Sequence, residues 1–448
     1  MTSSIYAFPT ELIRMIVEHV PEQDLRQLRL ASRKFYQETS EILFRRVYAS
    51  PHKKDLRVLS AIANHTVLRL CPREIVYVGA FFDSRLPKRS IWDRLAVEKR
   101  QFYVDRLKEQ EEMIKNGLDV NMITSALTKL PSIDKVIFSN HWCSESSNPP
   151  LMRDDPGCYL RPSGDIFADI DCENAPLYDH GLQVMCRAIS ISGLKLKELS
   201  MHYHCGSDFG YHNDDEPWNS GFHFESLPHD TGAIERACNT FQSMRKIKLS
   251  LTWTYYLDLP DIWQDRCAGL AKILSAATEL GELTLSFNQK PGVEVLYDGE
   301  SSKLPLTPAI LTTQPLPKLH TLRLRFKYML PEELIALLKP LAGTLKTLDL
   351  HGIYLNGSWR ATAMELHKIE WKQLEQASFV DLRECHGYLN GYNETPEIEF
   401  AHYRGVEACM RQGNPDLVCE ITERADQEWP PPNPTDDYCD SWAALNLY

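Results

Sequence analysis

The stretch Leu345-Lys346-Thr347-Leu348-Asp349-Leu350 decides the fold, because its spacing recurs along the chain. It has the form φ-x-x-φ-x-φ, in which φ is an apolar residue. The last three positions alternate with a period of two, which places the apolar side chains on one face of a β-strand. Clear copies begin at Ile133, Leu196, Met244, Leu280 and Leu319, and weaker ones at Pro72 and Leu374. The sequence therefore predicts a series of similar strands.

Helix-like segments precede several of these strands. Residues 232–241, 265–278 and 331–342 come before three of them, and Gly343 is predicted to end the last helix. A repeated helix and strand resemble a leucine-rich repeat. Successive copies from Ile133 to Leu374 lie 63, 48, 36, 39, 26 and 29 residues apart, whereas regular repeats take about 20 to 29. The predicted fold class is therefore α/β, an irregular leucine-rich-repeat-like solenoid of helix-strand units with long loop insertions.

The insertions are predicted where polar and turn-forming residues gather. Residues 140–174 are rich in Pro, Ser, Gly and Asp, and residues 205–230 are similarly polar. Residues 90–116 alternate in charge around a few apolar positions, which predicts a solvated helix with one buried stripe.

The first fifty residues carry a second pattern. Apolar residues recur at helical spacing after the start Phe8-Pro9-Thr10-Glu11, and Leu25 to Phe35 continue the pattern. They form a face too broad for so small a unit to bury alone, which implies a protein partner. Pro9 suits a first helical turn and Pro21 closes that helix, while Asp24 and Gln27 have the spacing of a capping box.

This pattern resembles an F-box over residues 5–48, with Phe8, Phe35 and Phe44 at positions where that family more often has Leu or Trp. The resemblance implies a three-helix unit that binds a Skp-type adaptor and, through it, a cullin. The core of the unit is expected to contain Leu25, Leu28, Phe35, Ile42 and Leu43. The predicted adaptor-binding residues are Phe8, Pro9, Leu12, Ile13, Ile16, Val20, Leu25, Leu28 and Leu30. Alternatively, the helices cap a larger domain and use the same leucines internally.

The C-terminal copies extend the resemblance. Leu337-Leu338, the stretch from Gly343 to Leu350, and Gly357-Ser358-Trp359 are similar to filamentous-fungal F-box proteins with degenerate leucine-rich repeats. The resemblance implies a substrate-recognition subunit of a Skp-cullin-F-box ubiquitin ligase with an unknown protein substrate. The alternative is a non-ligase interaction scaffold that uses the same F-box and repeats. The predicted domains are an F-box (1–50), a helical linker region (51–130), the repeats (131–390) and an acidic C-terminal region with a flexible tail (391–448).

Composition limits the possible functions and locations. The net charge of −12 argues against a general nucleic-acid or anionic-membrane binder. We find no eighteen-residue apolar window and no signal-peptide pattern, and the twelve cysteines are scattered without a CxxC pair. Reduced thiols are typical of intracellular proteins, so we expect a cytoplasmic or nuclear location. Residues 381–448 contain fourteen acidic and four basic residues, and the proline-rich run after Trp429 predicts an extended tail.

We predict no catalytic residues, no metal and no cofactor. The phosphate-binding, nucleophile-elbow and zincin motifs are all absent from the sequence. His202, His204 and Cys205 offer zinc donors, but their spacing matches no common structural zinc pattern, so a polar strand end is preferred. Cys143 has no identifiable base, and the acidic residues between Asp154 and Glu173 lack the glycine and terminal glutamate of a calcium loop.

Polar residues alternate with the apolar ones on the predicted strands and face outward if the repeats curve. These pairs are Ser200/His202, Lys248/Ser250, Thr284/Ser286, Arg323/Arg325 and Asp349/His351. The predicted substrate-binding residues are Lys248, Arg323, Arg325, Asp349 and His351. Their three cations suggest a site for an acidic or phosphorylated peptide. The alternatives are an ordinary solvated strand face and contact with the acidic C-terminal region.

Overall fold

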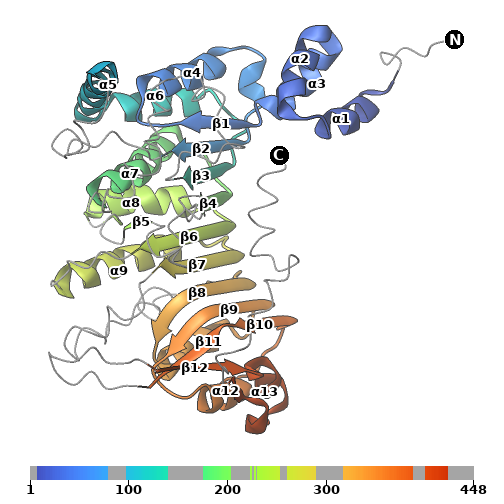
Figure 1. The fold of residues 1–448 in the computed structure, drawn as a ribbon, viewed down its shortest axis with the longest axis vertical. Helices are drawn as coiled ribbons and strands as arrows, with labels where there is room; N and C mark the ends of the chain where they lie inside the picture. Colours follow the sequence, from blue (N-terminus) through green and yellow to red (C-terminus); the bar gives the residue numbers. More distant parts are fainter. Residues whose placement is uncertain are drawn as a thin grey trace. The chain divides into compact units, whose positions relative to one another are not determined.

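The computed structural model describes residues 8–78, 97–139, 175–202, 222–223, 227–228, 230–252, 260–288, 316–386 and 399–421. The chain divides into two compact units. The first contains Met1–Asp169, Ile191–Leu194 and Glu428–Tyr448, and the second contains Ile170–Ser190 and Lys195–Gln427. The N-terminal helices are followed by repeated helix-strand units (Figure 1). The predicted α/β fold class is therefore confirmed.

The first unit begins with three helices, α1 (Thr10–Glu18), α2 (Glu22–Ala31) and α3 (Arg33–Leu43). Their core consists of Ile13, Val17, Leu25 and Phe35, against which Val20, Leu28, Ile42 and Leu43 pack. All five residues that the sequence assigned to this core belong to one of these two sets. The three helices thus have an apolar core of their own.

The starts of these helices follow from proline and serine. Pro9 and Pro21 are the residues immediately before α1 and α2, where a missing N–H costs no helical hydrogen bond. The Ser32 hydroxyl accepts a hydrogen bond of 3.2 Å from the Phe35 N–H and caps α3. The predicted capping box at Asp24 is wrong, because α2 already begins at Glu22 and Asp24 lies inside its first turn.

A parallel sheet follows the three helices in the first unit. Its strands are β1 (Arg46–Ala49), β2 (Glu74–Val78) and β3 (Lys135–Ser139), in that order. Between them the chain forms α4 (Lys53–Asn64), the short helix η2 (Leu68–Leu70), α5 (Val97–Lys115) and α6 (Leu118–Leu127). The sheet therefore begins within the predicted F-box segment and includes residues predicted to be a helical linker, well before residue 131.

The second unit continues the same alternation. Its parallel strands are β4 (Glu198–His202), β6 (Lys246–Thr252), β7 (Glu282–Asn288), β8 (Thr321–Met329), β9 (Thr347–Leu355) and β10 (Gln376–Val380), and β5 (Phe222–His223) pairs with β6. The α-helices are α7 (Ala175–Ser192), α8 (Thr231–Phe241), α9 (Pro260–Ala276), α11 (Pro331–Leu338), α12 (Trp359–His367) and α13 (Val406–Gln412). Two short helices complete them, η9 (Lys339–Leu341) and η10 (Pro415–Leu417).

The C-terminal strands depart from the repeat. The strand β11 (Leu382–His386) pairs in parallel with the end of β9 and antiparallel with β12 (Glu399–Arg404), which in turn pairs antiparallel with β13 (Cys419–Ile421). The predicted acidic C-terminal region thus contributes strands to the second unit. The predicted extended tail after Trp429 lies outside the described residues.

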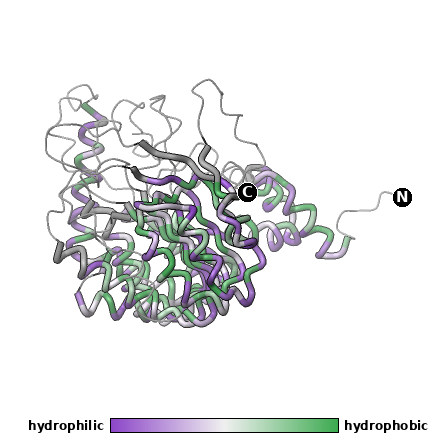
Figure 2. Tube along the Cα trace, turned by 90° about the horizontal axis from the view of Figure 1, so that it is seen from below, coloured by the Kyte–Doolittle hydropathy of each residue, from purple (hydrophilic) through white to green (hydrophobic). Residues whose placement is uncertain are grey.

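The recurring apolar triplets produce the core of the second unit. The second apolar positions, Ile247, Leu283, Leu322 and Leu348, are direct partners on successive strands, and the third positions form the next row. All members of both rows are buried. In Figure 1 these strands lie side by side, and in Figure 2 apolar and polar residues alternate along the chain. The arrangement is consistent with leucine-rich-repeat-like units. Among the described helices, none combines the length and apolar character needed to cross a membrane.

Replacing Leu348 with alanine should destabilise the second unit by about 2–5 kcal/mol, because the side chain is fully buried between Leu322 and Ala377 in the row. Chemical denaturation of the full chain measures the loss. Lys346→Ala, at an exposed position two residues earlier, is the matched control and should change stability by less than about 0.5 kcal/mol. A small effect of Leu348→Ala would contradict the assigned core.

Candidate functional site

An exposed apolar surface lies on the N-terminal helices. It consists of Phe8, Leu12, Met15, Ile16 and Leu30, and we call it the α1 face. Leu12, Met15 and Ile16 have the spacing i, i+3 and i+4, which aligns them on one side of α1, and Phe8 lies two residues before the helix. Leu30 contributes from α2 and is 81% exposed. So many large exposed apolar side chains on one small helical unit mark a surface that another protein can cover.

The opposite side of α1 faces inward. Ile13 is 1% exposed, and Val17 and Leu25 are likewise buried in the core. Of the nine residues predicted to contact an adaptor, Ile13 and Leu25 therefore support the unit from inside, and Val20 and Leu28 pack against that core. The exposed members of the predicted set are Phe8, Pro9, Leu12, Ile16 and Leu30.

Met15 belongs to the α1 face but is absent from the predicted adaptor-binding residues, although its helical spacing places it beside them. It lies three residues after Leu12 and seven after Phe8. Its side chain is more than half exposed. A strict count of helical positions would have found it.

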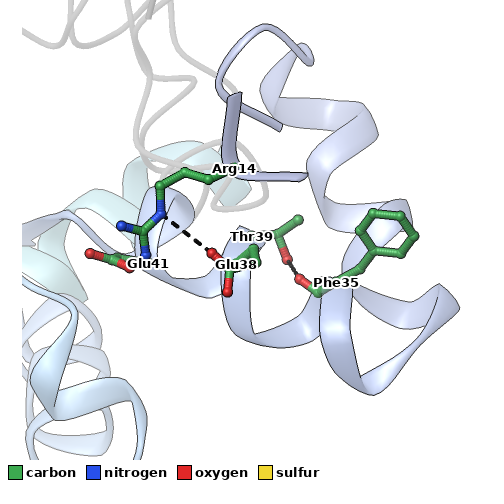
Figure 3. Close-up of polar contacts among 5 residues, drawn as sticks. All are labelled: Arg14, Phe35, Glu38, Thr39 and Glu41. Carbon is green, nitrogen blue, oxygen red and sulfur yellow. Dashed lines mark hydrogen bonds and ion pairs between the residues drawn. The ribbon is translucent and has the colours of Figure 1, made fainter. Parts of the chain in front are cut away.

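Polar contacts join α1 to α3 at the edge of the α1 face. The Arg14 guanidinium lies 3.3 Å from the Glu38 carboxylate and 2.5 Å from that of Glu41 (Figure 3). The Lys34 ammonium donates a hydrogen bond of 2.7 Å to the Phe8 carbonyl. Such exposed ion pairs each stabilise a protein by about 1 kcal/mol or less, so their main effect is to orient the helices.

The side chain of Arg29 joins α2 to α3 next to Leu30. Its guanidinium lies 4.6 Å from the centre of the Tyr36 ring and 4.9 Å from that of Phe44, within range of cation–π attraction. Its Nε also donates a hydrogen bond of 3.1 Å to the Ser40 hydroxyl. These contacts restrict the part of α2 from which Leu30 projects.

A second surface lies on the strands of the second unit, where polar residues alternate with the buried leucines. One row contains Lys248, Thr284, Arg323 and Asp349, which are direct partners across β6, β7, β8 and β9. The next row contains Ser250, Ser286, Arg325 and His351. We call the two rows the strand-face rows. The register brings four of the five predicted substrate-binding residues together on β8 and β9, and leaves Lys248 two strands away from Arg323.

The guanidinium groups of Arg323 and Arg325 are incompletely paired. The Asp349 Oδ2 atom lies 4.0 Å from Arg323 Nε and 3.8 Å from Arg325 Nη2, which is longer than a hydrogen bond. Arg325 Nε is buried and has no hydrogen-bond partner. The two guanidinium groups thus share one carboxylate as an ion-pair partner, and neither donates a hydrogen bond to it.

The backbone is unusual beside His351. Gly352 has φ of 63°, and Asp381 has φ of 50°, which is uncommon for a residue other than glycine. Asp381 follows Val380, the direct partner of His351. Its carboxylate accepts hydrogen bonds of 2.9 and 3.3 Å from Arg383, an interaction that helps to hold the strained turn. Strained residues of this kind cluster at functional sites, which supports a site here.

The environment of His351 favours a neutral imidazole. Burial lowers the pKa of His351 below its usual value, and the Arg325 guanidinium lowers it further. The carboxylates of Asp381 and Asp349 oppose this shift with smaller effects. The cluster thus consists of two cationic arginines, one shared carboxylate and a histidine that is neutral at pH 7, a set suited to binding an anion.

The described residues offer little support for metal or thiol chemistry. Within the described ranges no group of three or more His, Cys, Asp or Glu residues is placed to hold a metal ion. Burial raises the pKa of the Cys186 thiol to about 12 and also raises that of Cys71, so neither forms a thiolate readily at neutral pH. Several residues considered above for a zinc site, a thiol nucleophile or a calcium loop lie outside the described residues, namely Cys205, Cys143 and the acidic run after Asp154.

Comparison with known proteins identifies no family. No protein-family model matches the chain, and a search of curated proteins finds no similar sequence.

Because Ile13 and Ile16 lie on different sides of α1, replacing them with alanine should destabilise the helical unit to different extents. Ile13→Ala should destabilise the helical unit by about 2–5 kcal/mol because it leaves a cavity. Ile16→Ala is the matched control on the exposed side and should cost less than about 0.5 kcal/mol. Hydrogen exchange of the α1, α2 and α3 amides measures both. Equal protection in the two variants would contradict the assigned core.

The lowered pKa of His351 predicts a pH-dependent stability. Because the unfolded imidazole, with a pKa of about 6.5, binds a proton more readily than the folded one, the contribution of His351 is complete above that pH. It is lost as the pH falls through 6.5 toward the folded pKa, by at most about 1.4 kcal/mol per pH unit. His351→Gln should remove this component of acid destabilisation, measured by denaturation between pH 7.5 and 5.5. His19→Gln, on the exposed end of α1, is the control, and identical pH profiles for His351→Gln and the wild type would refute the effect.

Proposed function

We propose that this chain is the substrate-recognition subunit of a Skp-cullin-F-box ubiquitin ligase. Its three N-terminal helices would act as the F-box and bind a Skp-type adaptor, which connects them to a cullin. The helix-strand units, as degenerate leucine-rich repeats, would bind a protein substrate. The chain itself would be non-catalytic and would act in the cytoplasm or nucleus.

The α1 face carries this proposal. A three-helix unit that already has its own core still exposes Phe8, Leu12, Met15, Ile16 and Leu30. Apolar side chains that are not needed for a unit's own folding, three of which align on α1, favour docking against the apolar surface of a partner. This supports an adaptor-binding unit over a cap that uses the same leucines internally.

The strand-face rows support a recognition role for the rest of the chain. A parallel sheet with alternating buried and outward-facing side chains presents its outward residues at fixed spacing. Polar and charged residues occupy these positions on β6 to β9. A receptor needs such a surface and needs no catalytic group, because it increases the rate of ubiquitin transfer by holding the substrate near enzymes on other subunits.

The proposal predicts that Leu12 and Ile16 are energetically important contacts with the adaptor. Co-expression with a Skp-type adaptor and size-exclusion chromatography should yield an equimolar complex. The double variant Leu12→Ala, Ile16→Ala should lose it, because well-packed apolar contacts at an interface each contribute about 2 kcal/mol, or roughly thirtyfold in affinity. Glu18→Ala, an exposed polar position on the same helix, is the control and should bind normally.

Several outcomes distinguish the alternatives. A wild-type chain that is folded but elutes without the adaptor would refute the F-box role. An adaptor complex that does not recruit a cullin would instead support the non-ligase interaction scaffold. Loss of binding in the control as severe as in the double variant would show that α1 does not make the contact through the α1 face.

A further inference from the structure

We propose that the strand-face rows bind an extended peptide with two anionic side chains at positions i and i+2, one held by Arg323 and the other by Arg325. This inference rests on the proposed role of the helix-strand units as a recognition surface. It is independent of adaptor binding, because it concerns only residues of β6, β7, β8 and β9 in the second unit.

The spacing of the two arginines on β8 matches the repeat of an extended peptide. Arg323 and Arg325 are two residues apart on β8, and they flank the buried Leu324. Residues at i and i+2 of a strand project from the same face, about 6.6–6.8 Å apart. An extended peptide has the same repeat. When it lies along β8, two of its side chains on one face therefore match the two arginines.

The two arginines have hydrogen-bond donors that an anion can accept from. Each guanidinium has five N–H donors in a planar fork that matches the two oxygens of a carboxylate or phosphate. Among the described residues, the Arg323 and Arg325 side chains donate no hydrogen bond, and their only recorded ion-pair partner is Asp349 at 4.0 and 3.8 Å. Their side chains are 37% and 30% exposed. Apart from the buried Arg325 Nε, the guanidinium groups are thus partly exposed and have donors available to an incoming anion.

Neighbouring side chains indicate where the anions would lie. On the β9 side, Asp349 and His351 are the partners of the two arginines, and the carboxylate of Asp349 would repel a ligand. On the β7 side their partners are Thr284, which is buried, and Ser286, which is partly exposed; both are small and uncharged, and the Ser286 hydroxyl is a possible donor. Strands lie about 4.8 Å apart, so the positions above β7 are within reach of both guanidinium groups. The anionic side chains would therefore lie over β7.

Lys248 extends the site on the far side of β7. It is the direct partner of Thr284, and it lies on β6, about 10 Å from Arg323 across two strand spacings. Its ammonium adds a third positive charge, which favours peptides with a further acidic residue. The overall charge of −12 disfavours nucleic acid as the occupant and makes this local excess of cations distinctive.

Fluorescence anisotropy on the full chain tests the proposal. The probe is a short labelled peptide of Gly, Ser and Ala with glutamates at i and i+2. The comparison peptide has glutamates at i and i+1, which point to opposite sides of an extended chain. A third peptide carries phosphoserine in place of both glutamates. We expect the first or third peptide to bind at least about tenfold more tightly than the second, a difference of about 1.4 kcal/mol.

Arginine variants connect the binding to the two side chains. Arg323→Gln with Arg325→Gln should abolish the preference, while Arg323→Lys with Arg325→Lys, which keeps the charge but loses the planar fork, should retain weak binding. The matched control is Lys318→Gln with Lys346→Gln, which removes two exposed cations outside the rows and should bind normally. Circular dichroism and the thermal midpoint establish that each variant is folded.

The proposal would be overturned if neither the first nor the third peptide bound more tightly than the second. An equal loss of binding in the lysine control would also overturn it. A preference for phosphoserine would identify phosphate as the anion, and equal binding would identify carboxylate. Adaptor co-purification of the Arg323→Gln, Arg325→Gln variant is measured in parallel, so that failure of this inference is distinguishable from failure of the proposed ligase role.

Discussion

The structure depends on the burial of matched apolar rows across parallel strands. Because Ile247, Leu283, Leu322 and Leu348 are direct partners, each strand contributes to a core that no single helix-strand unit could form. A shift of one residue in the register would turn these side chains outward and bury the polar ones. The same constraint therefore fixes which residues are available for recognition.

The N-terminal helices differ from the sheet because α1 has more apolar surface than its own unit buries. The α1 helix is apolar on two sides, and the core of the three-helix unit accepts only the side that contains Ile13 and Val17. The side that contains Leu12 and Ile16 stays exposed. The folding of the three-helix unit does not need this second apolar side, and its exposure lowers solubility. The proposed contact with an adaptor would account for its presence.

The polar strand face shows how a repeated core can carry an irregular surface. The positions of the apolar triplets are constrained to be apolar, while the positions between them differ from strand to strand, from Thr284 to Arg323 to Asp349. Beside them the backbone bends at Gly352 and Asp381, and the chain leaves the parallel arrangement for the antiparallel strands β11, β12 and β13. The charged residues thus lie where the regular repeat ends.

Local spacing in the sequence determined much of this protein. The triplets beginning at Pro72 and at Leu374 predicted β2 and β10 as well as the clearer strands between them, because alternation with a period of two is a local property. The helix α5 at Val97–Lys115, within the predicted range 90–116, and the core residues Leu25 and Phe35 followed from helical spacing in the same way.

Other features depended on contacts between distant segments. The strand β1 is too short to be recognised alone and forms because it pairs with β2. Which side of α1 is buried was decided by its packing against α2 and α3, so the sequence could not separate Ile13 from Ile16. The sharing of Asp349 by two arginines arises from the register of β8 with β9. Spacing along the chain fixes which residues point the same way, but only tertiary packing decides which of those faces meets another segment and which remains exposed.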